Sequence, residues 1–541
     1  MKNAFIRSAK VLSAAATTLL VASSCTKDLD RTPTYDLNAD RVFTNAAAYK
    51  TQLAKIYGGF ALTGSTDPGS SNLGGGLDAG TSDYLRQYWS AQELTTDEAV
   101  IQWGDPGVQD WHNLSWTSSG ILIQGLYSRL QSEITFCNSY IAEASKTNLA
   151  TRNIASSDTA TITTYRAEAR FLRALAYYHA MDLYGSVAFT TEASPIGTAF
   201  SPPRIARADL FKYIEQELKG IENSLPNPRG NEYGRADKGA AWALLAKMYL
   251  NAKVYTGTER YTDAATYAKK VIDANYSLLP KYGNLFLADN DKNNTEIIFP
   301  IVFDGKFTQT YGGTTFLTHA AISSTSDANW SPDPYGVGSG WAGTRTTSAL
   351  FRLFPDTAAD RRGRFHTRGQ SLEIASQTDF TNGYVPIKYR NVTSAGVNGS
   401  DNTFVDIDYP MLRLADIYLT YAEAVSRGGT GDATLALQYV NQVRNRAFGG
   451  PTGGTAGAVT AATLTANDYQ FFLDERAREL HWEGTRRTDL IRFGKFASNA
   501  YLWPWKGGVA NGTSVPEYRN LFPIPASEVS VNPAIVQNTG Y

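Results

Sequence analysis

Three glutamates recur at four-residue intervals near the C-terminus, and this spacing is the one in the chain most able to support chemistry. Glu475, Glu479 and Glu483 fall on one face of a predicted helix, because residues four apart on a helix are neighbours. Such a row could bind a metal or perform acid–base work. Arginines are interleaved with it, so we expect the carboxylates to pair with arginines and to fix the last helix on the bundle. The expected partners are Arg476, Arg486 and Arg487.

Other catalytic patterns find no support in the sequence. The 5 histidines show no metal-ligand spacing, and there is no nucleophile elbow, phosphate loop or dinucleotide-binding motif after a predicted strand. We therefore predict no catalytic residue, no metal site and no cofactor, although a structural Ca²⁺ stays open. Glycoside hydrolysis needs only two carboxylates at a suitable separation, which a sequence does not reveal. A surface glycosidase is thus kept as an alternative.

Aromatic residues in polar loops predict a binding site instead. The chain has 10 Trp and 31 Tyr but only 4 Met. Tryptophan and tyrosine rings match the flat C–H faces of sugars, and Asp or Arg side chains bind sugar hydroxyls. Trp103 and Trp330 lead the candidates, since both lie among Gly, Pro, Asp and Ser without helical periodicity. The other candidates are Asp67, Asp83, Trp111, Tyr311, Trp341, Arg362 and Tyr389. For any single aromatic residue, packing inside the protein is an equally open interpretation.

The N-terminus has the features of a lipoprotein export signal. Lys2, Arg7 and Lys10 precede an apolar stretch over Val11–Val21, and small residues lead directly to Cys25. We predict a signal peptide over 1–24, lipidation of Cys25 and a tether over 25–40. An ordinary signal cleaved before an incidental cysteine is the alternative. No later stretch has 18 uninterrupted apolar residues, so the lipid would be the only membrane attachment. The formal net charge of −1 and the absence of a basic run argue against nucleic-acid binding.

Hydrophobic periodicity predicts a mostly α-helical protein with one domain over 41–541. Helices are expected over 121–144, 165–184 and 208–225. Two tetratricopeptide-like hairpins are expected, one pairing 238–250 with 262–274 and the other pairing 417–424 with 434–446. Residues 62–83 are predicted to form a loop, followed by short strands or irregular turns up to Trp116. A loop-rich insertion over roughly 281–410, with a buried strand at 296–303, would interrupt the helical scaffold of 41–280 and 411–541.

The chain resembles the SusD/RagB family over nearly its whole length. Five motifs in the family's order carry the resemblance: Arg166–Leu175 before Tyr184-Gly185; Leu412–Asp416; Val440–Ala447; Asp474–Gly484 before Arg486-Arg487 and Asp489-Leu490; and Phe522–Pro525 before Asn532-Pro533 and Gln537–Tyr541. The resemblance implies a surface-exposed, lipid-anchored protein of the outer membrane that binds an oligosaccharide without cleaving it. It also implies delivery of the ligand to a SusC-like TonB-dependent transporter. Peptide uptake of the RagB kind is the alternative that the resemblance leaves open.

Overall fold

The computed structural model describes residues 39–195, 200–323, 327–450 and 454–541. The predicted signal peptide, Cys25 and most of the predicted tether lie outside the described residues. Positions 39 and 40 of that tether instead begin a short helix, α2 (Ala39–Val42).

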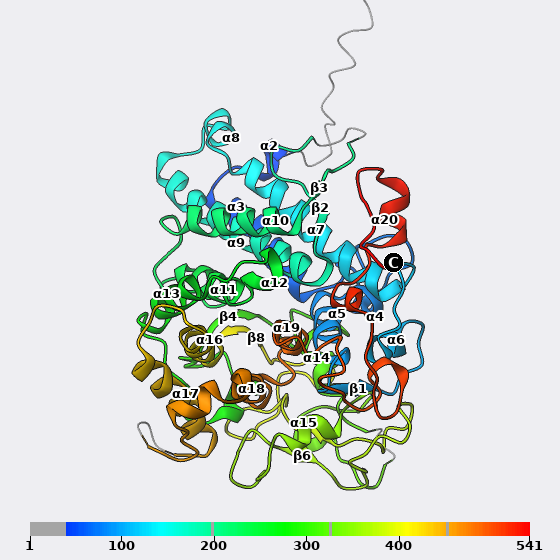
Figure 1. Ribbon diagram of the computed structural model, residues 1–541. Helices are drawn as coiled ribbons and strands as arrows, with labels where there is room; N and C mark the ends of the chain where they lie inside the picture. Colours follow the sequence, from blue (N-terminus) through cyan, green and yellow to red (C-terminus); the bar gives the residue numbers. More distant parts are fainter. Residues whose placement is uncertain (1–38, 196–199, 324–326, 451–453) are drawn as a thin grey trace, which may run out of the picture.

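Four long helices form one half of the scaffold, which occupies the upper part of Figure 1. They are α3 (Ala46–Ala61), α7 (Ile121–Glu143), α9 (Ser156–Tyr184) and α10 (Arg207–Ile221). Helix α9 packs against the other three, and from Phe171 to Tyr184 nearly every side chain on it is buried. The helices expected over 121–144, 165–184 and 208–225 are confirmed, although α9 begins nine residues earlier than the sequence predicted.

Both predicted helical hairpins are confirmed. Helix α11 (Lys238–Leu250) pairs with α13 (Tyr261–Ile272), and α16 (Leu414–Ser426) pairs with α17 (Ala433–Ala447). Helices α13 and α16 also pack on each other, which joins the two hairpins across the insertion between them. Buried alanines such as Ala264 and Ala268 permit this close approach. The mostly helical fold class is confirmed.

The remaining helices are short or lie near the C-terminus. They are α4 (Ala79–Ser82), α5 (Tyr84–Trp89), α6 (Val108–Asn113), α8 (Lys146–Thr151), α12 (Ala252–Thr256), α14 (Gly313–His319), α15 (Ser348–Arg352), α18 (Ala461–Leu480), α19 (Arg486–Arg492) and α20 (Ala526–Val531). A π-helix forms η1 (Ser90–Leu94), and 3-10 turns form η2 (Tyr282–Phe286), η3 (Asp333–Tyr335), η4 (Lys506–Gly508) and η5 (Glu517–Asn520). No helix in the described ranges combines the length and apolarity that crossing a membrane would require.

Strands are few and short in the described residues, and they pair only in antiparallel couples. The couples are β1 (Ala99–Ile101) with β5 (Thr344–Thr346), β2 (Val187–Ala188) with β3 (Arg204–Ile205), β4 (Ile297–Ile301) with β8 (Tyr409–Arg413), and β6 (Phe365–His366) with β7 (Val385–Pro386). Strand β4 confirms the predicted buried strand. Because β4 opens the insertion and β8 closes it, their pairing brings both ends of the insertion to one place on the scaffold. The body of the insertion, with α15 and β6, lies at the bottom of Figure 1.

The short strands or irregular turns predicted up to Trp116 are mostly wrong. Residues 84–113 form α5, η1 and α6, and only β1 is a strand. Five of the six side chains of α5, and all five of η1, are buried, so these segments lack the one-sided apolar pattern by which surface helices are recognised.

Candidate functional site

An arc of aromatic rings gathers where the N-terminal region meets the insertion. Trp103 and Trp341 have ring centroids 6.5 Å apart, and Tyr311 lies 6.3 Å from Trp341. Trp103 and Trp341 are half-buried, whereas Tyr311 is 42% exposed. We call Trp103, Tyr311 and Trp341 the aromatic arc. Its exposed ring faces offer apolar surface at the outside of the protein.

The pairing of β1 with β5 positions two of these rings. Ile101 lies opposite Thr344, and the Gln102 N–H continues the ladder to the Gly343 carbonyl at 2.9 Å. The Trp103 indole N–H then donates to the Trp341 carbonyl at 3.0 Å. A side chain at Gly343 would place a Cβ 2.8 Å from the Trp103 ring. Glycine therefore lets the indole lie directly against the backbone.

A buried histidine supports the arc from within. The His319 ring stacks on Trp341, with centroids 4.7 Å apart and 19° between the planes. Its two ring nitrogens lie 2.7 Å from the Ser339 carbonyl and 2.8 Å from the Thr403 carbonyl, so the ring is held at both ends. Burial lowers the pKa of His319, although the two carbonyl oxygens oppose this effect. The arc thus has a rigid backing.

Arg86 places a positive charge beside the arc, and the sequence analysis missed it. Its guanidinium carbon lies 5.2 Å from the Trp103 ring centroid and 4.8 Å from that of Phe316. Burial lowers the pKa of Arg86, while the carboxylates of Asp83, Asp78 and Asp105 raise it. The guanidinium carries several N–H donors, which suit sugar hydroxyls. The only signal in the sequence was that Arg86 follows Asp83 by three residues. Aspartate is a good helix N-cap residue, so this spacing indicates that Arg86 lies in the first turn of a helix.

Asp67 lies in the loop that contacts the other end of the arc. The Tyr311 N–H donates to the Pro68 carbonyl at 3.3 Å, and exposed Asp67 accepts from the Gly69 N–H at 2.9 Å. The predicted site residues Asp67, Trp103, Tyr311 and Trp341 are therefore brought together.

Four other predicted site residues are buried and contact other parts of the protein, so the structure does not bring them to the arc. Trp111 packs on Phe522 in the core, with ring centroids 5.1 Å apart. Asp83 caps α5 and also accepts from Thr63 and the Gly313 N–H. Tyr389 donates to the Trp482 carbonyl at 3.0 Å. Arg362 is sealed among carboxylates.

Trp330 lines a separate pocket in the insertion. Its ring stacks on His366 with centroids 3.6 Å apart and also contacts Tyr335 and Phe380. No ring contact among the described residues joins it to the aromatic arc. The leading pair, Trp103 and Trp330, thus falls into two different places.

The glutamate row is buried and paired, as expected, but its partners differ from those predicted. Glu475 contacts Arg362 at 2.7 Å and Arg444 at 2.6 Å. Glu479 contacts Arg413 at 2.7 Å. Glu483 contacts Arg413 at 2.6 Å and Lys388 at 2.7 Å. The row follows the helix face only to Glu479, because α18 ends at Leu480.

The predicted partners are engaged with other carboxylates. Arg476 pairs with Asp416 and Asp489, and Arg486 pairs with Asp97. Arg487 lies against the rings of Phe496 and Phe522. These three were wrong as partners of the glutamate row because the closest cations come from distant parts of the chain.

The electrostatics of the row fit a structural role. Burial alone would raise the pKa of Glu475, but the guanidinium groups of Arg362, Arg478 and Arg444 outweigh it and hold that pKa well below its usual range. A carboxylate held in its charged form by three cations is a poor proton donor or acceptor at neutral pH. Throughout the described part of the chain, no three His, Cys, Asp or Glu side chains gather as a metal would need.

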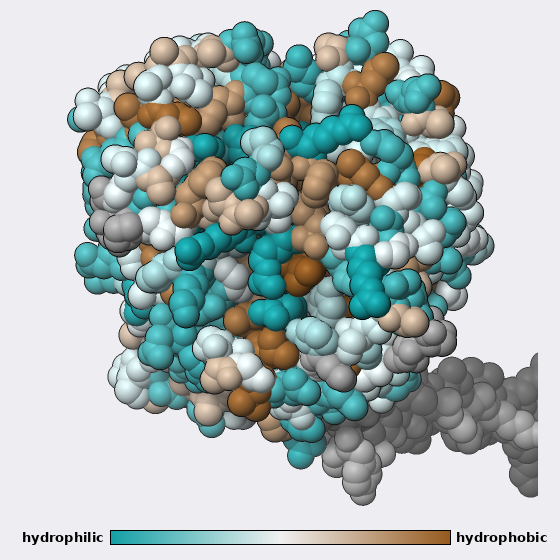
Figure 2. Space-filling view, turned by 90° about the horizontal axis from the view of Figure 1, so that it is seen from below, coloured by the Kyte–Doolittle hydropathy of each residue, from teal (hydrophilic) through white to brown (hydrophobic). Residues whose placement is uncertain are grey.

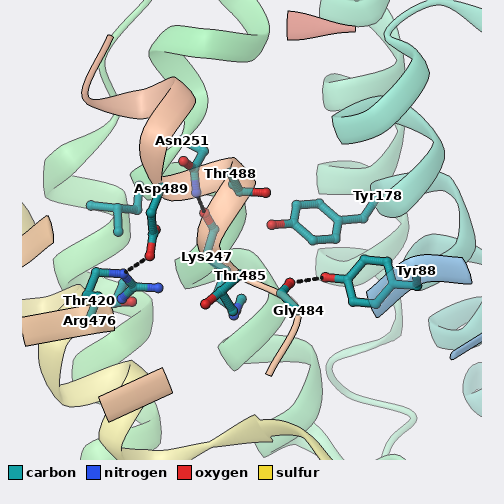
Figure 3. A pocket seen from close by; sticks show the side chains of 11 residues that line it. Tyr88, Tyr178, Lys247, Asn251, Thr420, Arg476, Gly484, Thr485, Thr488 and Asp489 are labelled. Carbon is teal, nitrogen blue, oxygen red and sulfur yellow. Dashed lines mark hydrogen bonds and ion pairs between the residues drawn. The ribbon is translucent and has the colours of Figure 1, made fainter. Parts of the chain in front are cut away.

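A small polar cavity of about 20 Å³ lies between α11, α16 and α19, and Figure 3 shows its lining. Arg476 donates to Asp489 at 2.8 Å, and Tyr88 donates to the Gly484 carbonyl at 2.8 Å. Lys247 pairs with Asp416. Because these groups bind one another, the cavity serves to attach α19 to the hairpins.

Comparisons with known proteins agree with this architecture. The model of the SusD family matches residues 363–541. The starch-binding protein SusD of Bacteroides thetaiotaomicron is 34% identical over 593 aligned positions, covering 100% of both chains. SusD-like protein P25 of Formosa agariphila is 28% identical over 69% of this chain and 73% of its own.

Two solved structures show the same fold. A SusD homologue from Bacteroides thetaiotaomicron gives a TM-score of 0.71 at 21% identity, covering 94% of this chain and 99% of the other. Surface glycan-binding protein A of the same organism, in complex with laminarihexaose, gives 0.66 at 20% identity, covering 91% and 99%.

Proposed function

The chain belongs to the SusD family, and we propose that it captures an oligosaccharide at the cell surface for uptake. The observation that carries the proposal is the aromatic arc. Its rings are partly exposed, backed by His319, and flanked by Arg86 and Asp67. This combination of flat apolar faces with polar groups at their edge suits a sugar ring.

The known relatives support the choice of ligand class. One full-length relative is named for starch binding, and one protein of the same fold was solved with laminarihexaose. We carry over only the class, an oligosaccharide, and leave the sugar and linkage open. Binding without cleavage fits a site whose chemistry is stacking, since the glutamate row is locked in ion pairs.

The cellular setting is also part of the proposal. Lipidation of Cys25 would anchor the protein to the outer membrane, with the glycan then passed to a SusC-like TonB-dependent transporter. A preformed arc favours such a transfer, because it costs little conformational entropy to bind.

Affinity electrophoresis tests the proposal with the chain from residue 26 to 541, which contains every described residue. Gels would contain a panel of polysaccharides, and Trp103→Ala and Tyr311→Ala would run beside the parent. Phe136→Ala is the matched control, since Phe136 on α7 is 43% exposed and Tyr311 is 42% exposed. We expect one polysaccharide to retard the parent and the control but not the arc variants.

Two outcomes would overturn the proposal. Retardation that persists in both arc variants would place binding elsewhere on the surface. Free migration in every gel, together with binding of extended peptides, would replace glycan capture with peptide uptake.

A further inference from the structure

The pocket that contains Trp330 has a volume of about 230 Å³ and lies in the insertion, and it shares no lining residue with the aromatic arc. It is lined by Trp330, Ser331, Pro334, Tyr335, Arg364, His366, Ile387 and Arg390. The turn η3 supplies Pro334 and Tyr335 and strand β6 supplies His366, while the other residues lie in the segments next to η3, β6 and β7. Figure 2 views the molecule from the side of the insertion, where small apolar patches are interleaved with polar side chains.

The apolar wall of the pocket is built from aromatic rings. Trp330 and Tyr335 have ring centroids 6.4 Å apart with 30° between their planes, and His366 stacks on Trp330 with 26° between the planes. Trp330 is 7% exposed and Tyr335 is 5% exposed. Nevertheless, neither the Trp330 indole nitrogen nor the Tyr335 hydroxyl has a hydrogen-bond partner among the described residues. Buried polar groups without partners are rare in folded proteins, so these two call for an explanation.

Two arginines supply positive charge at the same pocket. Burial and the nearby charge of Arg364 both lower the pKa of Arg390. Burial raises the pKa of Tyr335 to about 12, although both guanidinium groups act to lower it. Arg364, Arg390 and Tyr335 all line this pocket. No carboxylate of the described side chains pairs with either arginine, and Arg390 donates only a long bond, 3.5 Å, to the Pro334 carbonyl.

The acid nearest to His366 is otherwise engaged. Burial lowers the pKa of His366, although the charge of Asp327 acts to raise it. Its carboxylate accepts from the Ser323 hydroxyl at 3.0 Å and from the Asn329 N–H at 2.9 Å. The pocket thus combines two cations, two unused donors and an aromatic wall, which is the chemistry of a site for an anion on a ring.

We propose that this pocket binds the anionic substituent of an acidic sugar, either the carboxylate of a uronic acid or a sulfate ester. Arg364 and Arg390 bind the anion through guanidinium N–H groups, whose fork matches two oxygens of such a group. The Trp330 indole N–H and the Tyr335 hydroxyl supply the unused donors at the edge of the sugar ring. The inference rests on the proposed function for its ligand class and adds a second binding position that selects for charge.

Isothermal titration of the 26–541 chain at low salt tests the proposal with three probes: D-glucuronate, D-glucose 6-sulfate and neutral D-glucose. We expect at least one of the two anions to bind and glucose to show no binding. Arg364→Gln and Arg390→Gln should each weaken the anion about tenfold or more, because each removes a charged hydrogen-bond partner. Both arginines are at least partly exposed, so their variants should fold, and circular dichroism checks this.

Arg352→Gln is the matched control, because it removes the same charge from an exposed pair with Glu373 outside the pocket. Tyr311→Ala should bind the anionic probe as the parent does. Binding of glucuronate alone identifies a uronic acid, and binding of glucose 6-sulfate alone identifies a sulfated sugar.

Failure of this proposal is distinct from failure of glycan capture. If a polysaccharide retards the parent but neither anion binds, the pocket proposal falls and glycan capture stands. Anion binding that survives the Arg364→Gln, Arg390→Gln double variant also overturns it. Inorganic sulfate binding as tightly as glucose 6-sulfate would show that the sugar ring makes no contact, and would equally overturn it.

Discussion

Two regions of the molecule reverse the usual placement of polar and apolar residues. Charged side chains are buried beneath the insertion, whereas the aromatic arc lies at the surface. Arg362, Arg413 and Glu479 are almost wholly inaccessible to solvent, whereas Tyr311 is 42% exposed. The charges have their partners within the protein, but the exposed ring has room for a partner from outside. The contrast shows that a side chain is available to a ligand only where its hydrogen bonds, ion pairs or ring faces are not already engaged within the protein.

The charge cluster joins two regions that are distant in sequence. Arg413, at the end of β8, contacts Glu296 at 2.9 Å, Glu479 at 2.7 Å and Glu483 at 2.6 Å. Glu296 belongs to the insertion, Glu479 lies on α18, and Glu483 lies in the turn after α18. A buried pair is not a large source of stability by itself, yet removing one member leaves uncompensated charge. The cluster should therefore be intolerant of single changes.

Arg413→Met gives the largest expected effect, because it removes one shared cation from three buried carboxylates. Methionine retains much of the side-chain volume, so the loss of charge dominates. We expect the free energy of unfolding to fall by about 3–5 kcal/mol. Urea denaturation measures it, and a decrease below about 1 kcal/mol would mean that the carboxylates can be satisfied without Arg413.

Glu133 on α7 sharpens the comparison, since it is a buried carboxylate outside any such cluster. Neither oxygen has a hydrogen-bond partner among the described residues, and Arg129, 3.9 Å away, donates instead to Asn72 and two carbonyls. Burial raises the pKa of Glu133 to about 8, although Arg129 acts to lower it. The unfolded chain would release this proton at a pH near the ordinary value of 4.5.

Glu133 should therefore reduce stability as the pH rises. Between pH of about 4.5 and 8 the folded protein holds a proton that the unfolded chain has lost, so the free energy of unfolding falls across this window. Glu133→Gln has no such titration. The stability of Glu133→Gln relative to the parent should grow by a few kcal/mol from pH 5 to pH 8. Thermal unfolding of both proteins across this range measures it, and a constant difference would show that Glu133 is charged in the folded state.

The arc should respond in affinity and not in stability. Tyr311→Phe keeps the ring face and should retain glycan binding, whereas Tyr311→Ala should weaken it about threefold to tenfold. Either variant should unfold within about 1 kcal/mol of the parent, since Tyr311 lies at the surface with 42% of its area exposed. Equal loss of binding in both variants would instead identify the hydroxyl as the essential contact.

The smallest effect is expected at a charge pair on the surface. Arg352 and Glu373 lie 2.6 Å apart with 67% and 61% of their side chains exposed. Arg352→Met should change the free energy of unfolding by less than about 1 kcal/mol, because water screens the pair. Measured beside Arg413→Met, it isolates burial as the cause of the larger loss.

Much of the fold was predictable because amphipathic helices have a periodic signature. The two hairpins follow from apolar and small residues at helical spacing. The segment from Tyr84 to Asn113 was not predictable in this way, because α5 and η1 are buried on nearly all sides and α6 has only six residues. Arg478 pairs with Glu475 from three residues away, but Arg362, which contacts both Glu475 and Glu479, lies 113 and 117 positions away along the chain, so no local pattern could identify it.

The candidate site was predictable by residue type and not by arrangement. Trp103, Tyr311 and Trp341 were expected from their loop contexts. Trp341 lies beside Trp103 because β1 pairs with β5, and this pairing links positions more than two hundred residues apart. Trp330 lies outside that pairing. Arg362 and Tyr389 have the same chemistry as ligand-binding residues, and only burial distinguishes them.

The junction of β4 with β8, locked by Arg413, bears on how relatives of this protein can diversify. An insertion whose first strand and inner charges are shared with the scaffold cannot be exchanged as a block, because a foreign block would arrive without matching countercharges. New ligand preferences would then arise by substitution at exposed loop positions, one residue at a time, over a constant interior. Chimeras that graft single loops should fold more often than those that graft the whole insertion.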